Sequence, residues 1–120
     1  MDNLNFTEED NKAVEWCEKN YPEMTTEYKK IMMNQYIIFC KKHRNYGTGN
    51  INVGTNLETD GDVKLALTGL WFRLNDKIQR LKNLVVLGEP DTVGESIQDT
   101  FQDMSVYGII AQIVQQKKFK

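Results

Sequence analysis

ESIQDTFQDMSVYGIIAQIVQQ, residues 95–116, is the stretch that decides the fold. It reads as one long helix whose only charged residues are Glu95, Asp99 and Asp103. Because these three are spaced four apart, they lie on one slanting stripe, which continues through apolar residues such as Val106. We expect such a stripe to face the protein and not water. Three inward carboxylates need a partner, which could be a metal ion, a Lys or Arg side chain, or a polar ligand.

The same helix carries a second apolar group on another side, made of Ile97, Phe101, Met104 and Gly108. Apolar residues on two sides of one helix need two surfaces to cover them. We therefore expect the chain to associate into a homo-oligomer.

Length and composition predict one domain, residues 1–120, with a loose arm over residues 1–6. The net charge of −2 argues against a duplex nucleic-acid ligand, and no apolar run approaches the roughly 18 residues that span a bilayer. The acidic, polar N-terminus does not resemble a signal peptide, so the cytoplasm is the expected compartment. Cys17 and Cys40 fall inside helical patterns and are expected to be reduced core residues.

Hydrophobic spacing predicts an all-α fold, a helical bundle of about four principal helices. Besides the helix over 95–116, the pattern indicates helices over about 8–20, 22–42 and 63–86. Thr7, followed by three acidic residues, is typical of the cap that begins a helix. No strand period and no internal repeat is visible.

A long Gly/Asn-rich loop, HRNYGTGNINVGTNLETDGD, is predicted between the second and third helices, from His43 to Asp62. A connection of this length is uncommon in a compact domain and is often functional. Its backbone N–H groups could contact phosphate, although it lacks the Gly-Lys-Ser/Thr of a Walker loop. A mobile surface loop or a short hairpin is the alternative.

The helix over 63–86 carries a basic set beside its apolar stripe, formed by Arg73, Lys77 and Arg80 with Asp76 among them. One interpretation is a salt-bridged surface helix, which charge runs usually are. The other is a basic site that faces the acidic stripe of the last helix or a phosphate group.

Three segments together resemble the nucleotide modification associated domain 1 family: KKHRNYG (41–47), RLNDKIQRLKNL (73–84) and ESIQDTFQDMSVYGII (95–110). The resemblance implies a small, phage-type protein with a nucleotide-related role, which would act in the cytoplasm of a bacterial host. Carried onto this chain, the family's motifs fall on His43, Asn45, Tyr46, Gly47, Arg73, Asp76, Lys77, Arg80, Leu81, Glu95, Ser96, Asp99, Thr100, Asp103 and Tyr107. Asn45 departs from the Asp that the family usually has there, which weakens a metal interpretation.

The chain is also loosely similar to all-α nucleotide pyrophosphohydrolases of the MazG and dimeric dUTPase type. Those enzymes hold Mg²⁺ with carboxylates from neighbouring helices. Glu95, Asp99 and Asp103 resemble one half of such a site, while the basic set stands where the other acidic pair is expected.

Three hypotheses follow from these features. In the first, the chain binds a small nucleotide through His43, Asn45, Tyr46, Gly47, Arg73, Asp76, Lys77, Arg80 and Tyr107, either to sequester a nucleotide signal or to act in nucleotide metabolism. In the second, Glu95, Asp99 and Asp103 bind Mg²⁺, and the chain is a nucleoside triphosphate pyrophosphohydrolase. In the third, the charges neutralise one another and the chain is a protein-interaction module. The expected site lies between the last two helices, with the 43–47 segment at its mouth.

Overall fold

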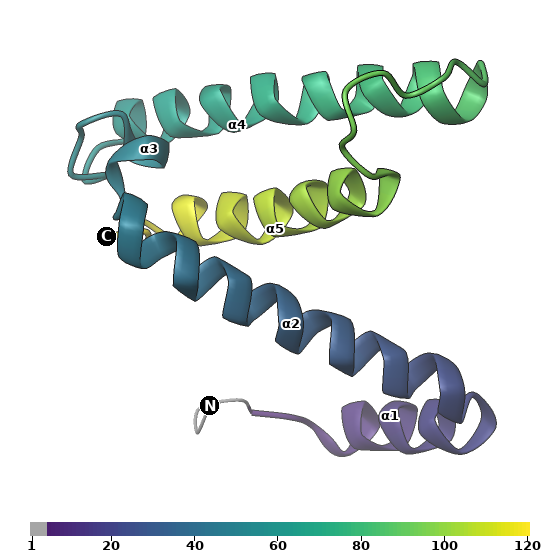
Figure 1. Cartoon of the computed structure of the whole chain (residues 1–120). Helices are drawn as coiled ribbons and strands as arrows, with labels where there is room; N and C mark the ends of the chain where they lie inside the picture. Colours follow the sequence, from purple (N-terminus) through teal and green to yellow (C-terminus); the bar gives the residue numbers. More distant parts are fainter. Residues whose placement is uncertain (1–4) are drawn as a thin grey trace. The chain divides into compact units, whose positions relative to one another are not determined.

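The computed structural model describes residues 5–120, which are helical and contain no strand (Figure 1). Its principal helices are α1 (Glu8–Asn20), α2 (Pro22–Tyr46), α4 (Asp60–Leu81) and α5 (Ile97–Gln115). A short helix, α3 (Gly49–Asn52), precedes α4, and a π-helical segment, η1 (Lys82–Val86), follows it. The all-α class is therefore confirmed. Most of the predicted N-terminal arm, residues 1–4, lies outside the described residues.

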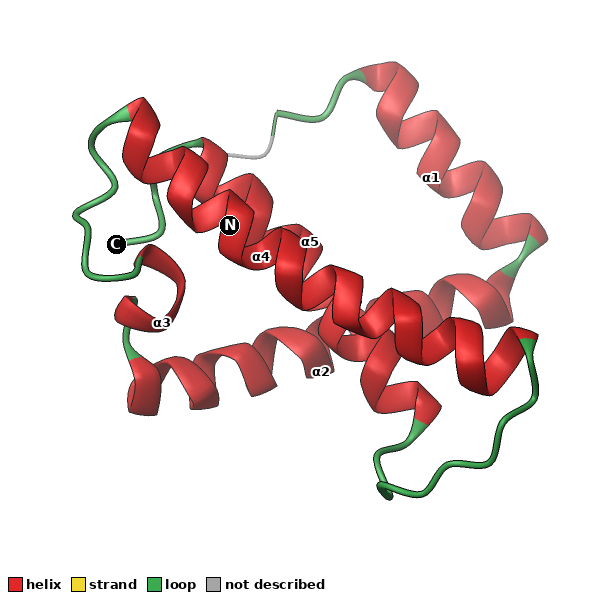
Figure 2. Cartoon of the chain, turned by 90° about the horizontal axis from the view of Figure 1, so that it is seen from above, coloured by secondary structure: helices red, strands yellow, loops and turns green. Residues whose placement is uncertain are grey.

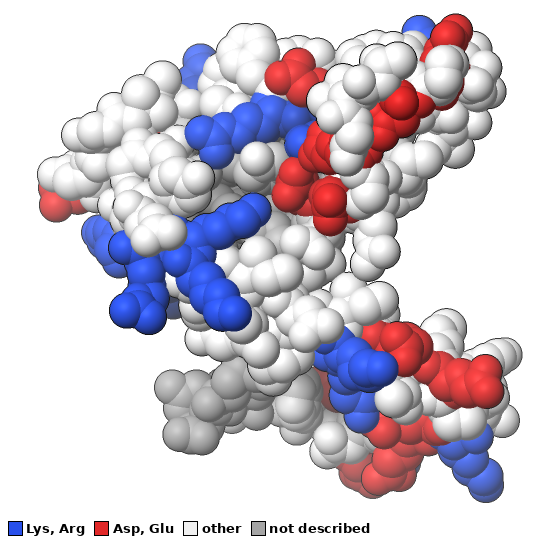
Figure 3. Space-filling model, viewed as in Figure 1, with Lys and Arg blue, Asp and Glu red and all other residues white. Residues whose placement is uncertain are grey.

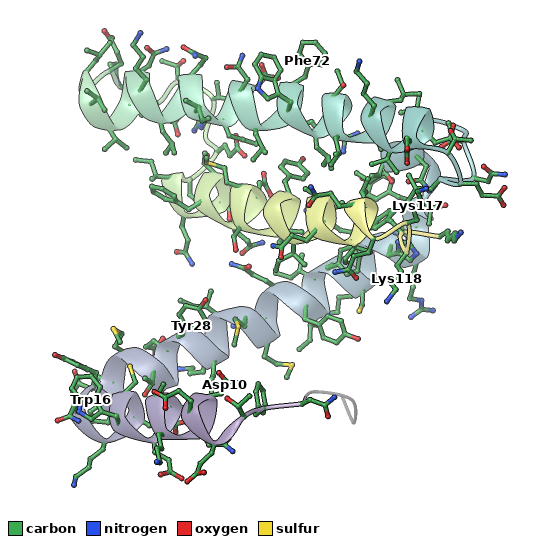
Figure 4. All side chains as sticks on the ribbon, turned by 180° about the vertical axis from the view of Figure 1, so that it is seen from behind. Asp10, Trp16, Tyr28, Phe72, Lys117 and Lys118 are labelled. Atoms are coloured by element: carbon green, nitrogen blue, oxygen red, sulfur yellow. The ribbon has the colours of Figure 1, made fainter. Side chains whose placement is uncertain are left out.

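Contacts divide the chain into two compact units, one ending at Ile38 and the other beginning at Phe39 within α2. In the first unit, α1 begins with a capping box, in which Thr7 Oγ1 accepts a hydrogen bond from Asp10 N at 3.1 Å and the Asp10 carboxylate accepts one from Thr7 N at 3.0 Å. An ion pair of 3.2 Å joins Lys29 to Glu18. Figure 4 labels Asp10, Trp16 and Tyr28 on these helices. The unit buries no residue of α1, so caps and surface pairs are its visible stabilising contacts.

The second unit has a small core between α4 and α5, which lie along each other in both Figure 1 and Figure 2. The buried apolar residues are Ile51, Leu57, Ala66, Leu70, Ile110, Val114 and Phe119. α3 and the C-terminal segment meet at one end of this core, where Asn52 Nδ2 donates to the Phe119 carbonyl at 2.7 Å. The core therefore fixes how α5 lies on α4.

The connection predicted as a long loop over 43–62 is shorter and more ordered than expected. α2 continues to Tyr46 and ends at Gly47, whose φ of 62° favours glycine. α3 follows, and Leu57 is fully buried in the core. The sequence pattern concealed this because Ile51 and Leu57 are isolated apolar residues among Gly, Asn and Thr.

Two helix ends also differ from the prediction. α4 begins earlier, at Asp60, because Thr59 and Asp62 form a capping box. α5 begins later, at Ile97, because Ser96 is its N-cap, so Glu95 precedes the helix. Cys17 is half-buried and Cys40 is exposed, so the expectation of a core residue is wrong for Cys40. Within residues 5–120, no helix combines the length and the apolar character that crossing a membrane requires.

Candidate functional site

An ion-pair network joins α4 to the beginning of α5. Lys77 Nζ lies 3.0 Å from Glu95 Oε1 and 3.0 Å from Asp103 Oδ2. The three side chains are between 19% and 33% exposed, so water screens them only in part. On the face displayed in Figure 3, basic and acidic side chains gather side by side over this region. The partner expected for Glu95 and Asp103 is therefore present within the chain, and it is a lysine.

The charge of Lys77 is stabilised by this pairing. Burial alone lowers the pKa of Lys77, but hydrogen bonds from Nζ to Asp103 and Glu95, together with their charges, outweigh it and raise the pKa above the ordinary 10.5. Lys77 is therefore a fixed cation near neutral pH and cannot serve as a base there.

Arg80 lies one helical turn further along α4 and ties three segments together. Its Nε donates to Thr100 Oγ1 at 3.2 Å and lies 3.5 Å from Glu95 Oε2. Its Nη2 donates to the Glu95 carbonyl and lies 3.3 Å from Asp91 Oδ1. Thr100 is completely buried, so the guanidinium is anchored against the interior of the helix pair.

The segment that leads into α5 is shaped by Asp91. Its Oδ1 accepts hydrogen bonds from Val93 N at 3.0 Å and Gly94 N at 3.3 Å. The hydrogen bond from Val93 is the main reason that the pKa of Asp91 is lowered from its ordinary value; desolvation opposes it, while Gly94 and Arg80 add to it. Asp91 therefore stays ionised and holds this turn beside Arg80.

A surface cavity of about 530 Å³ opens between the end of α4, η1 and this turn. Its lining residues are Arg80, Asn83, Leu84, Glu89, Pro90, Asp91, Thr92 and Val93. The lining combines one guanidinium, two carboxylates and an apolar wall. This volume is within the range of small-molecule sites.

Arg73 and Asp76 are not part of this network. Arg73 Nη2 donates to the Asn50 carbonyl at 2.7 Å, and its guanidinium lies 5.8 Å from the centre of the Tyr107 ring. Arg73 and Tyr107 therefore connect α3 to the helix pair. Asp76 is exposed.

The structure does not bring the three predicted metal ligands together. Asp99 is exposed, and its backbone N donates to the cap Ser96 Oγ at 3.0 Å. Glu95 precedes the helix, so the spacing of four does not place it on a stripe with Asp99, and Lys77 lies between Glu95 and Asp103. Within the described part of the chain, no three or more His, Cys, Asp or Glu side chains are grouped to hold a metal ion. These residues do not form a ready Mg²⁺ site.

The predicted 43–47 segment lies against the C-terminal segment. The His43 ring stacks on Phe39 at 5.7 Å and meets the Phe119 ring edge-on at 5.8 Å. Asn45 and Tyr46 are exposed. These contacts give His43 a packing role, and the structure does not connect it to Lys77 or Arg80.

Sequence reasoning missed Asp91, which lies in a stretch read only as a loop. The sequence signal for this role is short. An Asp that lies two residues before Val93 and three before Gly94 is typical of a side chain that accepts hydrogen bonds from the backbone N–H groups of its own turn. The apolar wall of the cavity left no periodic signal at all, because Leu84, Pro90 and Val93 come from η1 and an irregular segment.

Residues 67–114 match the model of the nucleotide modification associated domain 1 family. The match confirms the expected resemblance over the stretch that contains Lys77, Arg80, Asp91, Glu95 and Asp103, and it indicates a nucleotide-related role. No characterised protein and no solved structure matches the chain significantly.

Proposed function

We propose that this chain binds a small nucleotide at the cavity beside Arg80, through the basic and acidic residues that α4 and α5 bring together. The observation that carries the proposal is that a preorganised arginine lines a cavity within the region that matches a nucleotide-associated family. The biological role would be to sequester a nucleotide signal or to act in nucleotide metabolism.

Arg80 suits phosphate binding because its position is fixed before a ligand arrives. Its contacts with the described residues use Nε and Nη2, so the two N–H groups of Nη1 are available to a ligand. A guanidinium that is already held in place loses little side-chain freedom on binding. Phosphate oxygens are suitable acceptors for these N–H groups.

The charges of the lining favour a ligand with a single phosphate group. Arg80 is the cation, whereas Glu89 and Asp91 are carboxylates that would repel a chain of phosphates. Carboxylates instead accept hydrogen bonds from ribose hydroxyls or base amino groups. Leu84, Pro90 and Val93 offer an apolar wall for a base. A nucleoside monophosphate or a cyclic nucleotide fits this lining better than a triphosphate.

The second candidate is a Mg²⁺-dependent nucleoside triphosphate pyrophosphohydrolase. The observation that favours it is that the carboxylates of Glu95 and Asp103 converge on one cation, which is Lys77 Nζ. A metal ion would have to displace that ammonium group, and for this reason binding is ranked first.

The test is a thermal-shift screen of nucleoside monophosphates, diphosphates and triphosphates, cyclic nucleotides and dinucleotides, with and without Mg²⁺. Chromatography then shows whether each stabilising ligand is recovered intact. We expect stabilisation by a ligand with one phosphate group, independent of Mg²⁺, and recovery of that ligand unchanged. Consumption of a triphosphate only with Mg²⁺ would favour the hydrolase. No stabilisation by any of them would leave the network as protein architecture and favour an interaction module.

Two variants and one control assign the binding to the cavity. Arg80→Gln removes the guanidinium, and Asn83→Leu narrows the cavity without breaking an ion pair; both should abolish the ligand-induced shift. Lys82→Gln changes an exposed basic residue beside the cavity that is not one of its lining residues, so it should bind like the original chain. Equal loss in all three variants would contradict the proposed site.

A further inference from the structure

The side of the α4–α5 pair away from the ion-pair network is apolar. Because Lys77 and Asp103 touch, they mark the line along which the two helices meet. At about 100° per residue, Trp71 and Ile78 lie about 120° and 100° around α4 from Lys77. In the same rotational sense, Ile97 and Met104 lie about 120° and 100° around α5 from Asp103.

These residues share one side because α4 and α5 run in opposite directions (Figure 1). In antiparallel helices, the same sense of rotation from the contact line leads to the same side of the pair. We call this surface the apolar face. It consists of Trp71 and Ile78 from α4 with Ile97 and Met104 from α5. Gly108 and Phe101, about 140° and 160° around α5 from Asp103 in the same sense, lie at its outer edge.

Much of the apolar face is open to solvent within one chain. Trp71 is 59% exposed and Phe101 is 54% exposed, and Ile78 and Ile97 are also exposed. Exposed apolar side chains gathered on one surface mark an interaction site more often than scattered ones do. Among the described residues of the unit that begins at Phe39, nothing covers this surface.

The distribution of charge suits a second copy of the same chain as that cover. A symmetric interface brings a patch against itself, so like charges near its centre would repel. On this side α5 carries no charged residue, and α4 carries charges only in its first turns, at Asp60 and Lys64, while Lys82 follows in η1. Lys77 and Asp103 lie on the line where the two helices meet, and Arg80 lies about 60° from that line in the opposite sense, so neither cation has to face its own copy.

The size of the apolar face also suits a stable dimer. α5 has 19 residues, so it is about 28 Å long, and two adjacent helices are about 20 Å wide. The resulting flat footprint is about 560 Å², without the additional surface of protruding side chains. It approaches the roughly 800 Å² per partner of a standard interface.

Gly108 gives a further reason to expect a facing helix at this surface. A Cβ built on Gly108 would meet no atom within 4 Å, and its φ is not positive, so nothing within this chain requires glycine there. Glycine weakens the middle of a helix relative to alanine. At the outer edge of the apolar face, its missing side chain would let a facing helix approach closely.

We propose that the apolar face binds the same face of a second copy of this chain. Two α4–α5 pairs then form a four-helix core, and the two Arg80 cavities lie on opposite outer sides. This inference does not rest on nucleotide binding, because neither the residues nor the test involves a ligand.

The experiment is light scattering coupled to gel filtration, with sedimentation equilibrium for the dissociation constant. The original chain should have twice the 14.0 kDa mass of one chain. Trp71→Glu should return the mass of one chain with unchanged helical circular dichroism. Gly108→Ala should raise Kd at least about tenfold, although alanine favours the helix.

Ile109→Glu is the matched control. Ile109 is 50% exposed, but it lies about 120° around α5 from Asp103 in the opposite sense, on the other side of the pair. It should remain a dimer. The proposal would be overturned by a single-chain mass for the original protein at every concentration. It would equally be overturned if Ile109→Glu dissociated the protein as completely as Trp71→Glu.

Discussion

The two sides of the α4–α5 pair meet their physical needs in different ways. Where the two helices meet and to one side of that line, the cations of Lys77 and Arg80 find carboxylates within the same chain, at distances of 3.0–3.5 Å. On the other side, Trp71 and Phe101 are more than half exposed. A charged group needs only one or two well-placed atoms of opposite charge, whereas an apolar face needs a whole second surface to shield it from water. Among the described residues of the unit that begins at Phe39, the first need is met and the second is not.

The largest effect should come from breaking the charged side at Lys77. Lys77→Met leaves Glu95 and Asp103 close together without their shared cation. Removal of one partner from a buried pair costs roughly 3–5 kcal/mol, and partial exposure reduces the expected loss in unfolding free energy to about 2 kcal/mol. Urea denaturation measures it, and a fitted loss below about 0.5 kcal/mol would contradict the importance of the network.

Lys12→Met is the control for this change. Lys12 pairs with Glu8 at 3.5 Å, but both side chains are well exposed, so its loss should be within about 0.5 kcal/mol. A loss equal to that of Lys77→Met would mean that burial does not distinguish the two pairs.

A smaller effect should come from Thr100, which anchors Arg80 on the charged side. Thr100→Val keeps the shape of this buried side chain but removes the oxygen that accepts from Arg80 Nε. We expect a loss of about 1 kcal/mol in unfolding free energy, together with weaker nucleotide binding, because Arg80 is then less firmly held. Thr68→Val, at an exposed hydroxyl that donates only within its helix, should change neither quantity appreciably.

The smallest effect is expected from pH near neutrality. Because the folded pKa of Lys77 is raised above 10.5, its contribution to stability is complete below 10.5 and is lost as pH rises through the folded value. Because the folded pKa of Asp91 is lowered from 3.8, its contribution is present above 3.8 and is lost as pH falls through the folded value. Between these limits, neither group should change the melting temperature.

Melting curves of the original chain and Lys77→Met test this. The melting temperature of the original chain should fall at alkaline pH, and the variant should lack the part of this fall that is due to Lys77. If the melting temperatures of both proteins changed equally near neutral pH, the pH dependence would belong to other groups.

The sequence was sufficient to predict the principal helices. Of the two interpretations it left open for the basic set, the one in which that set faces carboxylates of the acidic stripe holds for Lys77 and Arg80 and not for Arg73. Periodicity placed Lys77 and Arg80 beside the apolar stripe of α4, and Asp103 on the inner side of α5. It also predicted the second apolar side of α5. These predictions succeeded because they depend on the geometry of single helices.

What the sequence could not predict depends on where helices end and on contacts between distant segments. Ser96, a cap, moves Glu95 out of the helix, and Asp99 then becomes an exposed first-turn residue instead of a third inward carboxylate. His43 packs on Phe119, which is 76 positions later in the chain, and no local pattern announces that contact. Leu84 and Val93 form the cavity wall only after η1 and the Asp91 turn have folded.

The most direct test of the central claim is an NMR titration of the chain with a nucleoside 5′-monophosphate. The account predicts that the amide resonances of Val93 and Gly94 and the Nε resonance of Arg80 shift in a saturable way. Resonances of α1 should stay in place. Saturable shifts confined to residues far from the Arg80 cavity, or no shifts at ligand concentrations that saturate comparable sites, would contradict it.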